Sequence, residues 1–262
     1  MARPHGLIQA YRSEQSLSVL STKSVVKLVF LELSTINSPT IDYQLPNHQL
    51  LSLGLKRLFD IVFAAFGLLV LSPLFLLLAV AVKLSSRGPV LFRQQRVGQD
   101  GRLFCIVKFR SMVVNAEKMG ISVTKDGDSR ITRVGRFLRK TKADELPQLW
   151  NVLRGNMSFV GPRPEVPRYV AHYTAEQRRV LALKPGITDL ATLEFRNEEE
   201  LLRTATDTEK FYLEYCVPRT IELNLAYADR ANLWEDTKII LRTVFCWERE
   251  GKQISERLRP EG

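Results

Sequence analysis

A run of 22 residues without a charged side chain, from Ile61 to Val82, dominates the pattern of hydrophobic and polar positions along the chain. About 20 apolar residues suffice to cross the ~30 Å hydrocarbon core of a bilayer, so length alone predicts a transmembrane helix. Ser72 and Pro73 interrupt the run near its middle. Proline removes a helical hydrogen bond and collides with the preceding turn, which predicts a kink or a break there.

Basic residues at both ends of the run bear on its topology. Lys56 and Arg57 precede it, and Lys83 and Arg87 follow it. Basic residues next to membrane segments favour the cytoplasmic side, and a straight span would place one of these groups outside. Each half of the run, at about 16–18 Å, can reach the middle of the bilayer and return. The pattern favours a re-entrant helix hairpin over residues 53–86, with a kinked span or a buried helix pair as the alternatives.

Beyond residue 86 the pattern is that of a globular domain, with short apolar segments between turns. Two β-prone stretches surround Gly98-Gln99-Asp100-Gly101, which predicts a β-hairpin. We predict helices over residues 110–118 and 131–140. The fold class is therefore α+β, mostly helical with a small β-hairpin, preceded by the re-entrant helix hairpin broken at Ser72-Pro73.

The chain of 262 residues is long enough for one domain with extensions and too short for two full enzymatic domains. We divide it into four parts. These are a poorly specified amino-terminal extension, the membrane hairpin, a globular domain and a charged tail, over residues 1–52, 53–86, 87–247 and 248–262 respectively.

The net charge of +10 implies an acidic partner, which is a nucleic acid, an anionic lipid surface or a phosphorylated substrate. The basic residues form no recognised nucleic-acid motif, so we do not expect a nucleic-acid partner. Three widely spaced cysteines predict neither a disulfide framework nor a metal cluster, and they fit a reducing cytoplasm. The three histidines are too scattered to form a metal site.

Two adjacent carboxylates, Asp144 and Glu145, are the strongest chemical feature of the chain. Apolar residues recur at helical spacing over residues 146–153, which predicts an amphipathic helix that ends at Gly155. Proline is tolerated only in the first turn of a helix, so Pro147 places both carboxylates at or just before the helix start.

Position and surroundings give this pair a possible chemistry. The helix dipole and the nearby basic residues Arg139, Lys140 and Lys142 are expected to favour the ionised carboxylates. Such a pair can hold a divalent cation against a polyphosphate, and an ionised aspartate can attack phosphorus. The alternative is that Asp144 and Glu145 are ordinary first-turn residues, because Thr141 and Asp144 are spaced like a capping pair.

Residues 155–169 contain glycines and prolines in close order, which predicts a rigid loop. Such a loop can aim Arg163 at a fixed point, and its planar guanidinium suits phosphate oxygens. The alternative is a surface arginine in a tight turn.

Taken together, these segments resemble the bacterial sugar transferase family, the monotopic polyprenyl-phosphate phosphoglycosyl transferases. The resemblance is dense over residues 55–190 and loose beyond them. The matching segments are KRLFD (56–60), the apolar run with Ser72-Pro73, GPVLFRQQRVGQDGRLFCIVKFRSM (88–112), the stretch from DSRITRVG to GPRP (128–164) and LKPGIT (183–188).

The resemblance implies a phosphoglycosyl transferase with a cytoplasmic catalytic domain and interfacial helices. Asp144 and Glu145 would be the catalytic pair and the ligands of Mg²⁺. Arg139 and Arg163 would contact substrate phosphate, as would Lys108 and Arg110 of the KFRSM segment, for which facing lipid headgroups is the alternative.

In this family the aspartate attacks the β-phosphate of a UDP-sugar and releases UMP, and undecaprenyl phosphate then takes the sugar phosphate from the enzyme. The reaction begins the assembly of exopolysaccharide, capsule, O-antigen or a related glycan, including the glycan of lipopolysaccharide. It implies a location on the cytoplasmic face of the bacterial inner membrane among its lipids, and allows a homo-oligomer.

The sequence departs from many relatives at Asp189 and Thr192, where a glycine and a glutamine are usual. This indicates a different branch of the family, so the reaction carries over from the relatives but their substrate preference does not. The first 50 residues cannot supply the membrane spans and soluble domain of larger relatives, so we expect a minimal catalytic form. The rival interpretations are a non-catalytic basic scaffold on the membrane surface and a membrane-tethered nucleic-acid-binding protein.

Overall fold

The computed structural model of the protein describes residues 47–116, 119, 124, 127–195, 198–203 and 207–245. The predicted charged tail and all of the predicted extension before residue 47 lie outside these residues.

The apolar run forms two helices, α2 (Asn47–Val70) and α3 (Ser72–Ser85). The predicted break is confirmed: the axes bend by 62° at Leu71, with Pro73 in the first turn of α3. The hydrogen bonds Leu71 N to Gly67 O (2.9 Å) and Phe75 N to Leu71 O (2.8 Å) continue on both sides of the bend. Among the described residues no single helix is long and apolar enough to cross a membrane, whereas this bent pair has the required length and composition.

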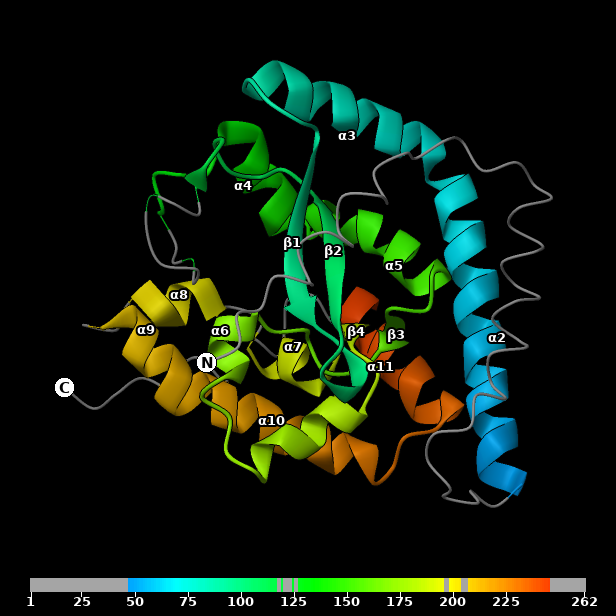
Figure 1. Cartoon of the computed structure of the whole chain (residues 1–262). Coiled ribbons are helices and arrows are strands. Elements are labelled where there is room, and N and C mark those ends of the chain that lie inside the picture. The colour runs from blue at the N-terminus through cyan, green and yellow to red at the C-terminus, as the bar shows by residue number, and fades with distance from the viewer. Residues whose placement is uncertain are drawn as a thin grey trace, which may run out of the picture. The chain divides into compact units, whose positions relative to one another are not determined.

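Helices α2 and α3 lie along one edge of the described domain (Figure 1). One side of each helix packs inward: Ala64 contacts the cluster of Val152 and Met157, and Val82 contacts that of Phe109 and Leu138. The other side exposes large apolar side chains, namely Val62, Phe63, Phe66, Leu69, Val70, Leu74, Leu76, Leu77, Val80 and Leu84. Such a large exposed apolar surface is typical of a face that another apolar phase covers.

The predicted β-hairpin is confirmed and lies at the centre of the domain (Figure 1). Strands β1 (Leu91–Val97) and β2 (Leu103–Phe109) pair antiparallel, with Phe92 opposite Lys108. The turn η2 (Gln99–Gly101) joins them, and Asp100 (φ 55°) and Gly101 (φ 75°) adopt the left-handed conformation that turns of this kind need.

The predicted helix over residues 110–118 is wrong for the residues that the structure describes. Arg110 N donates to Val90 O (2.9 Å), which continues the hairpin, and Met112 bridges to Ile131. Pairing with a distant segment therefore overrides the local pattern. The next predicted helix is confirmed as α4 (Arg133–Lys140), which Thr132 caps by accepting a hydrogen bond from Gly135 N (2.9 Å).

The segment predicted as one rigid loop contains a strand, β3 (Ser158–Val160), that pairs in parallel with β4 (Gly186–Thr188). The two chains approach so closely that a Cβ on Gly186 would lie 2.1 Å from Gly161 N. Glycine is therefore required where this pair ends. Only three residues on each side form the pair, which is too short for a readable pattern of alternation.

The remaining elements are short helices and two longer helices near the carboxyl end. In chain order they are η4 (Ala143–Gln148), α5 (Leu149–Leu153), α6 (Pro167–Val170), η5 (Gln177–Ala182), α7 (Leu190–Glu194), α8 (Glu198–Arg203), α9 (Thr208–Phe211), the π-helix η6 (Tyr212–Cys216), α10 (Val217–Ala228) and α11 (Leu233–Phe245). Figure 1 shows α4 near one end of the β-hairpin and α10 near the other.

Candidate active site

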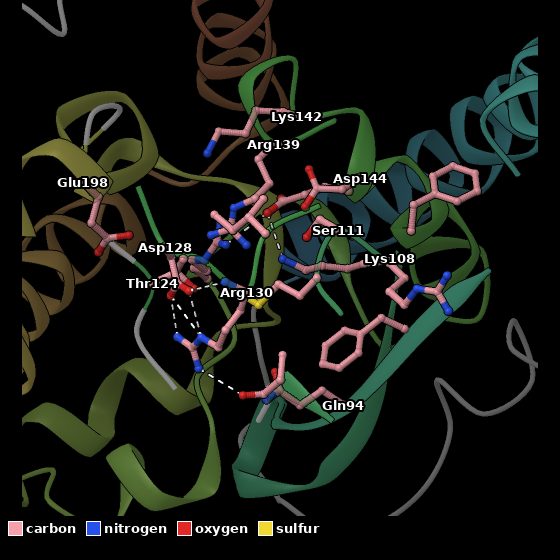
Figure 2. Close-up of a pocket in the computed structure, with 18 of the residues that line it drawn as sticks. Gln94, Lys108, Ser111, Thr124, Asp128, Arg130, Arg139, Lys142, Asp144 and Glu198 are labelled. Atoms are coloured by element: carbon pink, nitrogen blue, oxygen red, sulfur yellow. Dashed lines mark hydrogen bonds and ion pairs between the residues drawn. The ribbon is translucent and has the colours of Figure 1, made fainter. Parts of the chain in front are cut away.

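A cleft of about 1530 Å³ brings together most of the residues singled out from the sequence. Both strands of the hairpin, α4, η4, the segment after β3, α7 and η6 contribute to its wall. Figure 2 shows Lys108, Arg139, Lys142 and Asp144 among the side chains that line it. The predicted site residues Lys108, Arg110, Arg139, Asp144, Glu145 and Arg163 all lie on this wall.

Asp144 and Glu145 lie at the start of η4, as Pro147 predicted, although this first stretch is a 3₁₀-helix rather than the start of an α-helix. Lys142, in the left-handed conformation (φ 55°), turns the chain from α4 into η4. The helix continues into α5, and Gly155 (φ 82°) ends the segment as predicted. Both carboxylates are buried, although each faces the cleft.

Glu145 is held between two cations. A single carboxylate oxygen, Oε1, accepts from Lys108 Nζ (2.9 Å) and from Arg163 Nη2 (3.0 Å). Burial opposes the charged form, but Arg163, Lys108 and Lys142 outweigh it and hold the pKa of Glu145 well below its usual range. Glu145 is therefore an anion that fixes the two cations, as the sequence predicted for its charge state.

Asp144 differs from Glu145 in the direction of its pKa shift, although the nearby cations were expected to favour the ionised form of both. Its Oδ1 atom is buried and has no hydrogen-bond partner. Burial, followed by the Glu145 carboxylate, raises the pKa of Asp144 against the opposing effect of Lys108, Arg139 and Lys142. The expected direction of the shift is thus corrected for Asp144, because loss of hydration outweighs the nearby cations.

The capping alternative is not observed. The Thr141 hydroxyl donates to Phe137 O (2.9 Å) at the end of α4, so it does not begin η4. Lys142 occupies the N-cap position of η4, and no side chain caps that helix. A buried carboxylate oxygen without a hydrogen-bond partner costs free energy, and a ligand bound to Asp144 in the cleft would remove this cost.

The oxygen atoms of the two carboxylates are ligands of the kind that a magnesium ion binds. Asp144 offers the unpartnered oxygen, and carboxylate oxygen is the ligand that Mg²⁺ prefers. Among the described residues no group of three or more His, Cys, Asp or Glu side chains could hold a metal ion. Mg²⁺ in proteins is usually held by one or two carboxylates together with substrate phosphates and water.

Arg163 follows β3 and is held by its backbone as well as by Glu145. Its N–H donates to Asp189 Oδ2 (3.2 Å), and Asp189 also accepts from Thr192 N (2.6 Å) and Asn224 Nδ2 (2.9 Å). Asp189, only 1% exposed, therefore links the loop of Arg163 to α7 and α10. The sequence indicated Asp189 only as a departure from relatives; its place before the helix LATLE was the available signal of an N-cap.

The other predicted substrate ligands divide into two groups. Lys108 reaches the carboxylate pair from β2, and burial lowers its pKa against the pull of Glu145. Arg110 points its Nη2 atom at Ser86 O (2.7 Å) and Ser86 Oγ (3.0 Å), just after α3. Its guanidinium lies beneath Gly88 (φ 123°), where a Cβ would come within 2.3 Å of Nη1. Arg110 therefore binds the chain that leaves α3.

Comparison with known proteins decides the family. The sequence profile described as "Bacterial sugar transferase" matches residues 51–249, which include the helix hairpin and every predicted site residue. The chain belongs to the bacterial sugar transferase family. It is therefore a transferase, and the resemblance found in the sequence is confirmed.

Among similar bacterial sugar transferases, a UDP-glucose:undecaprenyl-phosphate glucose-1-phosphate transferase of Caulobacter vibrioides is 42% identical over 192 residues, which are 72% of this chain and 68% of that protein. An Escherichia coli transferase described by the same words is 44% identical over 73% of this chain and 39% of its own length. A UDP-N-acetylgalactosamine-undecaprenyl-phosphate N-acetylgalactosaminephosphotransferase of Aeromonas hydrophila is 39% identical over 72% of this chain and 43% of its own length. The chain thus spans less than half of the last two relatives.

Proposed function

We propose that this transferase moves a sugar 1-phosphate from a UDP-sugar to undecaprenyl phosphate, or a similar polyprenyl phosphate, and releases UMP. The observation that carries the proposal is the buried, unpartnered Oδ1 of Asp144 in a cationic cleft of a bacterial sugar transferase. The names of the relatives from Caulobacter, Escherichia coli and Aeromonas support this donor and acceptor. The step begins the assembly of a surface glycan.

In the first step a carboxylate oxygen of Asp144 attacks the β-phosphorus of the donor. The bond from this phosphorus to the oxygen that bridges to the α-phosphate breaks, and UMP leaves with that oxygen. The product is an acyl phosphate between Asp144 and the sugar phosphate. A phosphate oxygen of the polyprenyl phosphate then attacks the same phosphorus, which releases the Asp144 carboxylate and forms a polyprenyl diphosphate sugar.

The surrounding residues supply position and charge, which phosphoryl transfer needs more than acid–base chemistry. Glu145 fixes Lys108 and Arg163 within reach of the transferred phosphate, and Arg139 and Lys142 add positive charge on the same wall. Asp144 and Glu145 would hold Mg²⁺, which would neutralise pyrophosphate charge and favour the ionised form of Asp144. Two steps suit two substrates of different character, because the nucleotide can leave before the lipid enters.

We place the reaction at the cytoplasmic face of the bacterial inner membrane, with α2 and α3 as a re-entrant hairpin. The apolar outer face of both helices and the 62° bend between them support this topology. Arg133, Arg136 and Lys140 are exposed on α4 next to the exposed Phe137, a combination suited to anionic headgroups and acyl chains. The lipid phosphate would enter along this helix.

The decisive experiment is UMP release by the purified protein in detergent with Mg²⁺, undecaprenyl phosphate and a panel of UDP-sugars. We expect UMP with one donor or a few, and Asp144→Asn should lower the rate on the order of 10³-fold or more, because an amide is a very poor nucleophile. Incubation with donor alone should leave a sugar phosphate attached to Asp144 in the unaltered protein, detected by mass spectrometry after rapid quenching.

Asp100→Asn is the matched control, because it makes the same chemical change in the exposed hairpin turn, where asparagine tolerates φ 55°. Full activity of Asp144→Asn would reject the covalent mechanism. No UMP from folded, unaltered protein with any donor would reject the proposed reaction, and the rival scaffold or nucleic-acid-binding functions would then predict that Asp144→Asn binds vesicles or DNA as the unaltered protein does.

A further inference from the structure

The wall of the cleft differs in charge from one side to the other. On the side of α4 and the turn into η4 it carries four basic residues beside the catalytic carboxylates: Arg136, Arg139, Lys140 and Lys142. Arg93 and Arg163 line the side of α7, α8, η6, β1 and the loop after β3, and Arg163 is paired with Glu145. The other polar residues of that side include Gln94, Glu165, Thr192, Glu198 and Tyr212, together with Arg96. We call this second set the hydroxyl wall. Figure 2 shows Glu198, Gln94, Arg139 and Lys142 at different places around the cleft, with Lys108 close to Asp144.

Arg96, the basic residue of the hydroxyl wall, is bound by other groups of this side of the cleft. Arg96 Nε donates to Gln94 Oε1 (2.9 Å), and Nη1 donates to Pro164 O (3.0 Å). The same Nη1 lies 3.8 Å from a carboxylate oxygen of Glu165. This guanidinium therefore serves to hold the wall together, and the wall carries no surplus of positive charge for a phosphate.

Tyr212 ties the hydroxyl wall to the catalytic loop. It opens the π-helix η6, and its hydroxyl donates to Glu165, two residues after Arg163. Burial and then the carboxylates of Glu165 and Glu198 raise the pKa of Tyr212 well above its usual value, so the phenol keeps its proton. A π-helical turn re-aims the side chains next to it and is frequent at functional sites. The wall is thus a built part of the cleft.

Carboxylates select between the parts of a nucleotide sugar. They repel phosphate, but they accept hydrogen bonds from hydroxyl groups, and such charge-assisted bonds are stronger than neutral ones. A UDP-sugar carries both kinds of group: two phosphates between a ribose and a sugar ring. Because the reacting phosphate must lie at Asp144, the charges of the two sides orient the rest of the donor.

From this arrangement we propose that the hydroxyl wall binds the hydroxyl groups of the donor's rings, with Glu198 as an acceptor, while the α4 side receives the lipid phosphate. The inference rests on the proposed function and adds the orientation of the donor to it. Packing supports the assignment of the other side, because Leu138 of α4 lies in one cluster with Leu78 and Val82 of the membrane hairpin. The two substrates then approach Asp144 from opposite sides.

Glu198→Gln tests the inference, because it keeps the shape of the side chain and removes its charge. The dissociation constants of UDP, of inorganic pyrophosphate and of the UDP-sugar that supports UMP release are measured by calorimetry. We expect binding of the UDP-sugar to weaken about tenfold, as for loss of one charge-assisted hydrogen bond. Pyrophosphate should bind equally well or up to about threefold more tightly, because a repulsive charge has been removed. Misfolding would weaken both.

A comparison of UDP with the UDP-sugar identifies the ring. Equal weakening assigns Glu198 to the ribose, and weakening of the UDP-sugar alone assigns it to the sugar; either result supports the inference. Thr192→Val gives a second test, because it removes a hydroxyl from the wall and keeps the backbone N–H that Asp189 accepts. Glu222→Gln is the control for charge alone, since this side chain is 68% exposed on α10.

The inference is overturned if Glu198→Gln and Thr192→Val each bind UDP and the UDP-sugar within twofold of the unaltered protein. That result, with normal UMP release by the unaltered protein, would leave the proposed function standing. Absence of UMP release from the unaltered protein would reject the proposed function itself, and the orientation with it.

Discussion

Asn151 takes no part in the proposed reaction, but its side chain positions Lys108, which does. Its Nδ2 donates to Cys105 O (2.8 Å), and its Oδ1 accepts from Val107 N (3.0 Å). The side chain is 2% exposed and takes the place of a missing strand at the free edge of β2. Lys108 is the next residue on that strand, and Asn151 lies on α5, directly after the helix that carries Asp144 and Glu145. The side-chain amide of Asn151 therefore joins the strand that carries Lys108 to the helices that carry Asp144 and Glu145.

We predict that Asn151→Ala lowers the free energy of unfolding by about 2–4 kcal/mol, because it leaves two buried backbone groups of β2 without partners. The turnover rate should also fall, about tenfold, since Lys108 loses its fixed distance from Glu145. Denaturant unfolding in detergent and UMP release measure the two effects. Asn156→Ala, an exposed asparagine five residues further on, is the control and should change neither. A loss of stability below 1 kcal/mol would contradict this role.

At the scale of elements, sequence reasoning succeeded where a local cause determines the structure. The β-hairpin follows from a turn whose residues tolerate positive φ, and the start of η4 follows from Pro147. It failed where pairing with a segment distant in the sequence determines the structure. The predicted helix over residues 110–118 is wrong because Arg110 pairs with Val90 and Met112 with Ile131, and β3 is formed only because β4 lies beside it.

The same distinction applies to the site. Asp144, Glu145 and Arg163 lie in compact motifs, and the sequence singled them out. Glu198 and Asp189 reach the cleft from helices that no periodicity links to it, so only the fold places them there. The direction of the pKa shift of Asp144 was wrongly predicted for a similar reason, because burial, which depends on packing, outweighs its basic neighbours in the sequence.

Helix α2 is docked onto the catalytic domain by polar side chains that the KRLFD segment supplies. Arg57 Nη1 donates to Val152 O (2.6 Å) at the end of α5, and a carboxylate oxygen of Asp60 accepts from Ser158 Oγ and Phe159 N (both 3.1 Å) on β3. These contacts fix α2 to the elements that follow Glu145 and precede Arg163. The direction of α3 beyond Leu71 then depends on the bend.

Pro73→Ala restores the amide that the helix lacks and should favour a straighter α2–α3 pair, so we predict that part of the protein changes topology. Single cysteines at Leu55 and Arg87, in a chain with its three native cysteines replaced by alanine, report the topology by labelling with a membrane-impermeant reagent. Without the proline change both should label only in inside-out vesicles. With Pro73→Ala, a fraction should expose the two sites on opposite faces. Pro89→Ala, beyond α3, is the control.

Labelling of positions 55 and 87 on opposite faces without the proline change would exclude the re-entrant topology. Labelling on one face with and without Pro73→Ala would instead show that the docking of α2 by Arg57 and Asp60 suffices to keep the hairpin closed. The two outcomes therefore separate the bend from the docking as the cause of the topology.

At the scale of the whole molecule, the described domain contains both an exposed apolar face on α2 and α3 and several separate buried clusters. One of these clusters joins Tyr169, Leu202 and Cys216 beside the hydroxyl wall. Buried groups that must stay neutral make the stability of such a cluster depend on pH. Cys216 is fully buried, and burial followed by the charge of Glu198 raises its pKa to about 12 from 9.0.

This shift predicts that the protein loses stability at alkaline pH. Below pH 9 the thiol is protonated in both the folded and the unfolded chain, so the full stability is present. Between pH 9 and about 12 the unfolded chain loses this proton while the folded chain keeps it, and the free energy of unfolding falls by about 1.4 kcal/mol per pH unit from this one group. Cys216→Ala should be less stable at pH 8, because of the lost volume, but its stability should fall less steeply between pH 9 and 11. Cys105→Ala is the control and should keep the steep fall; identical slopes for Cys216→Ala and the unaltered protein, measured by denaturant unfolding in detergent, would show that Cys216 is not the group whose proton the fold retains.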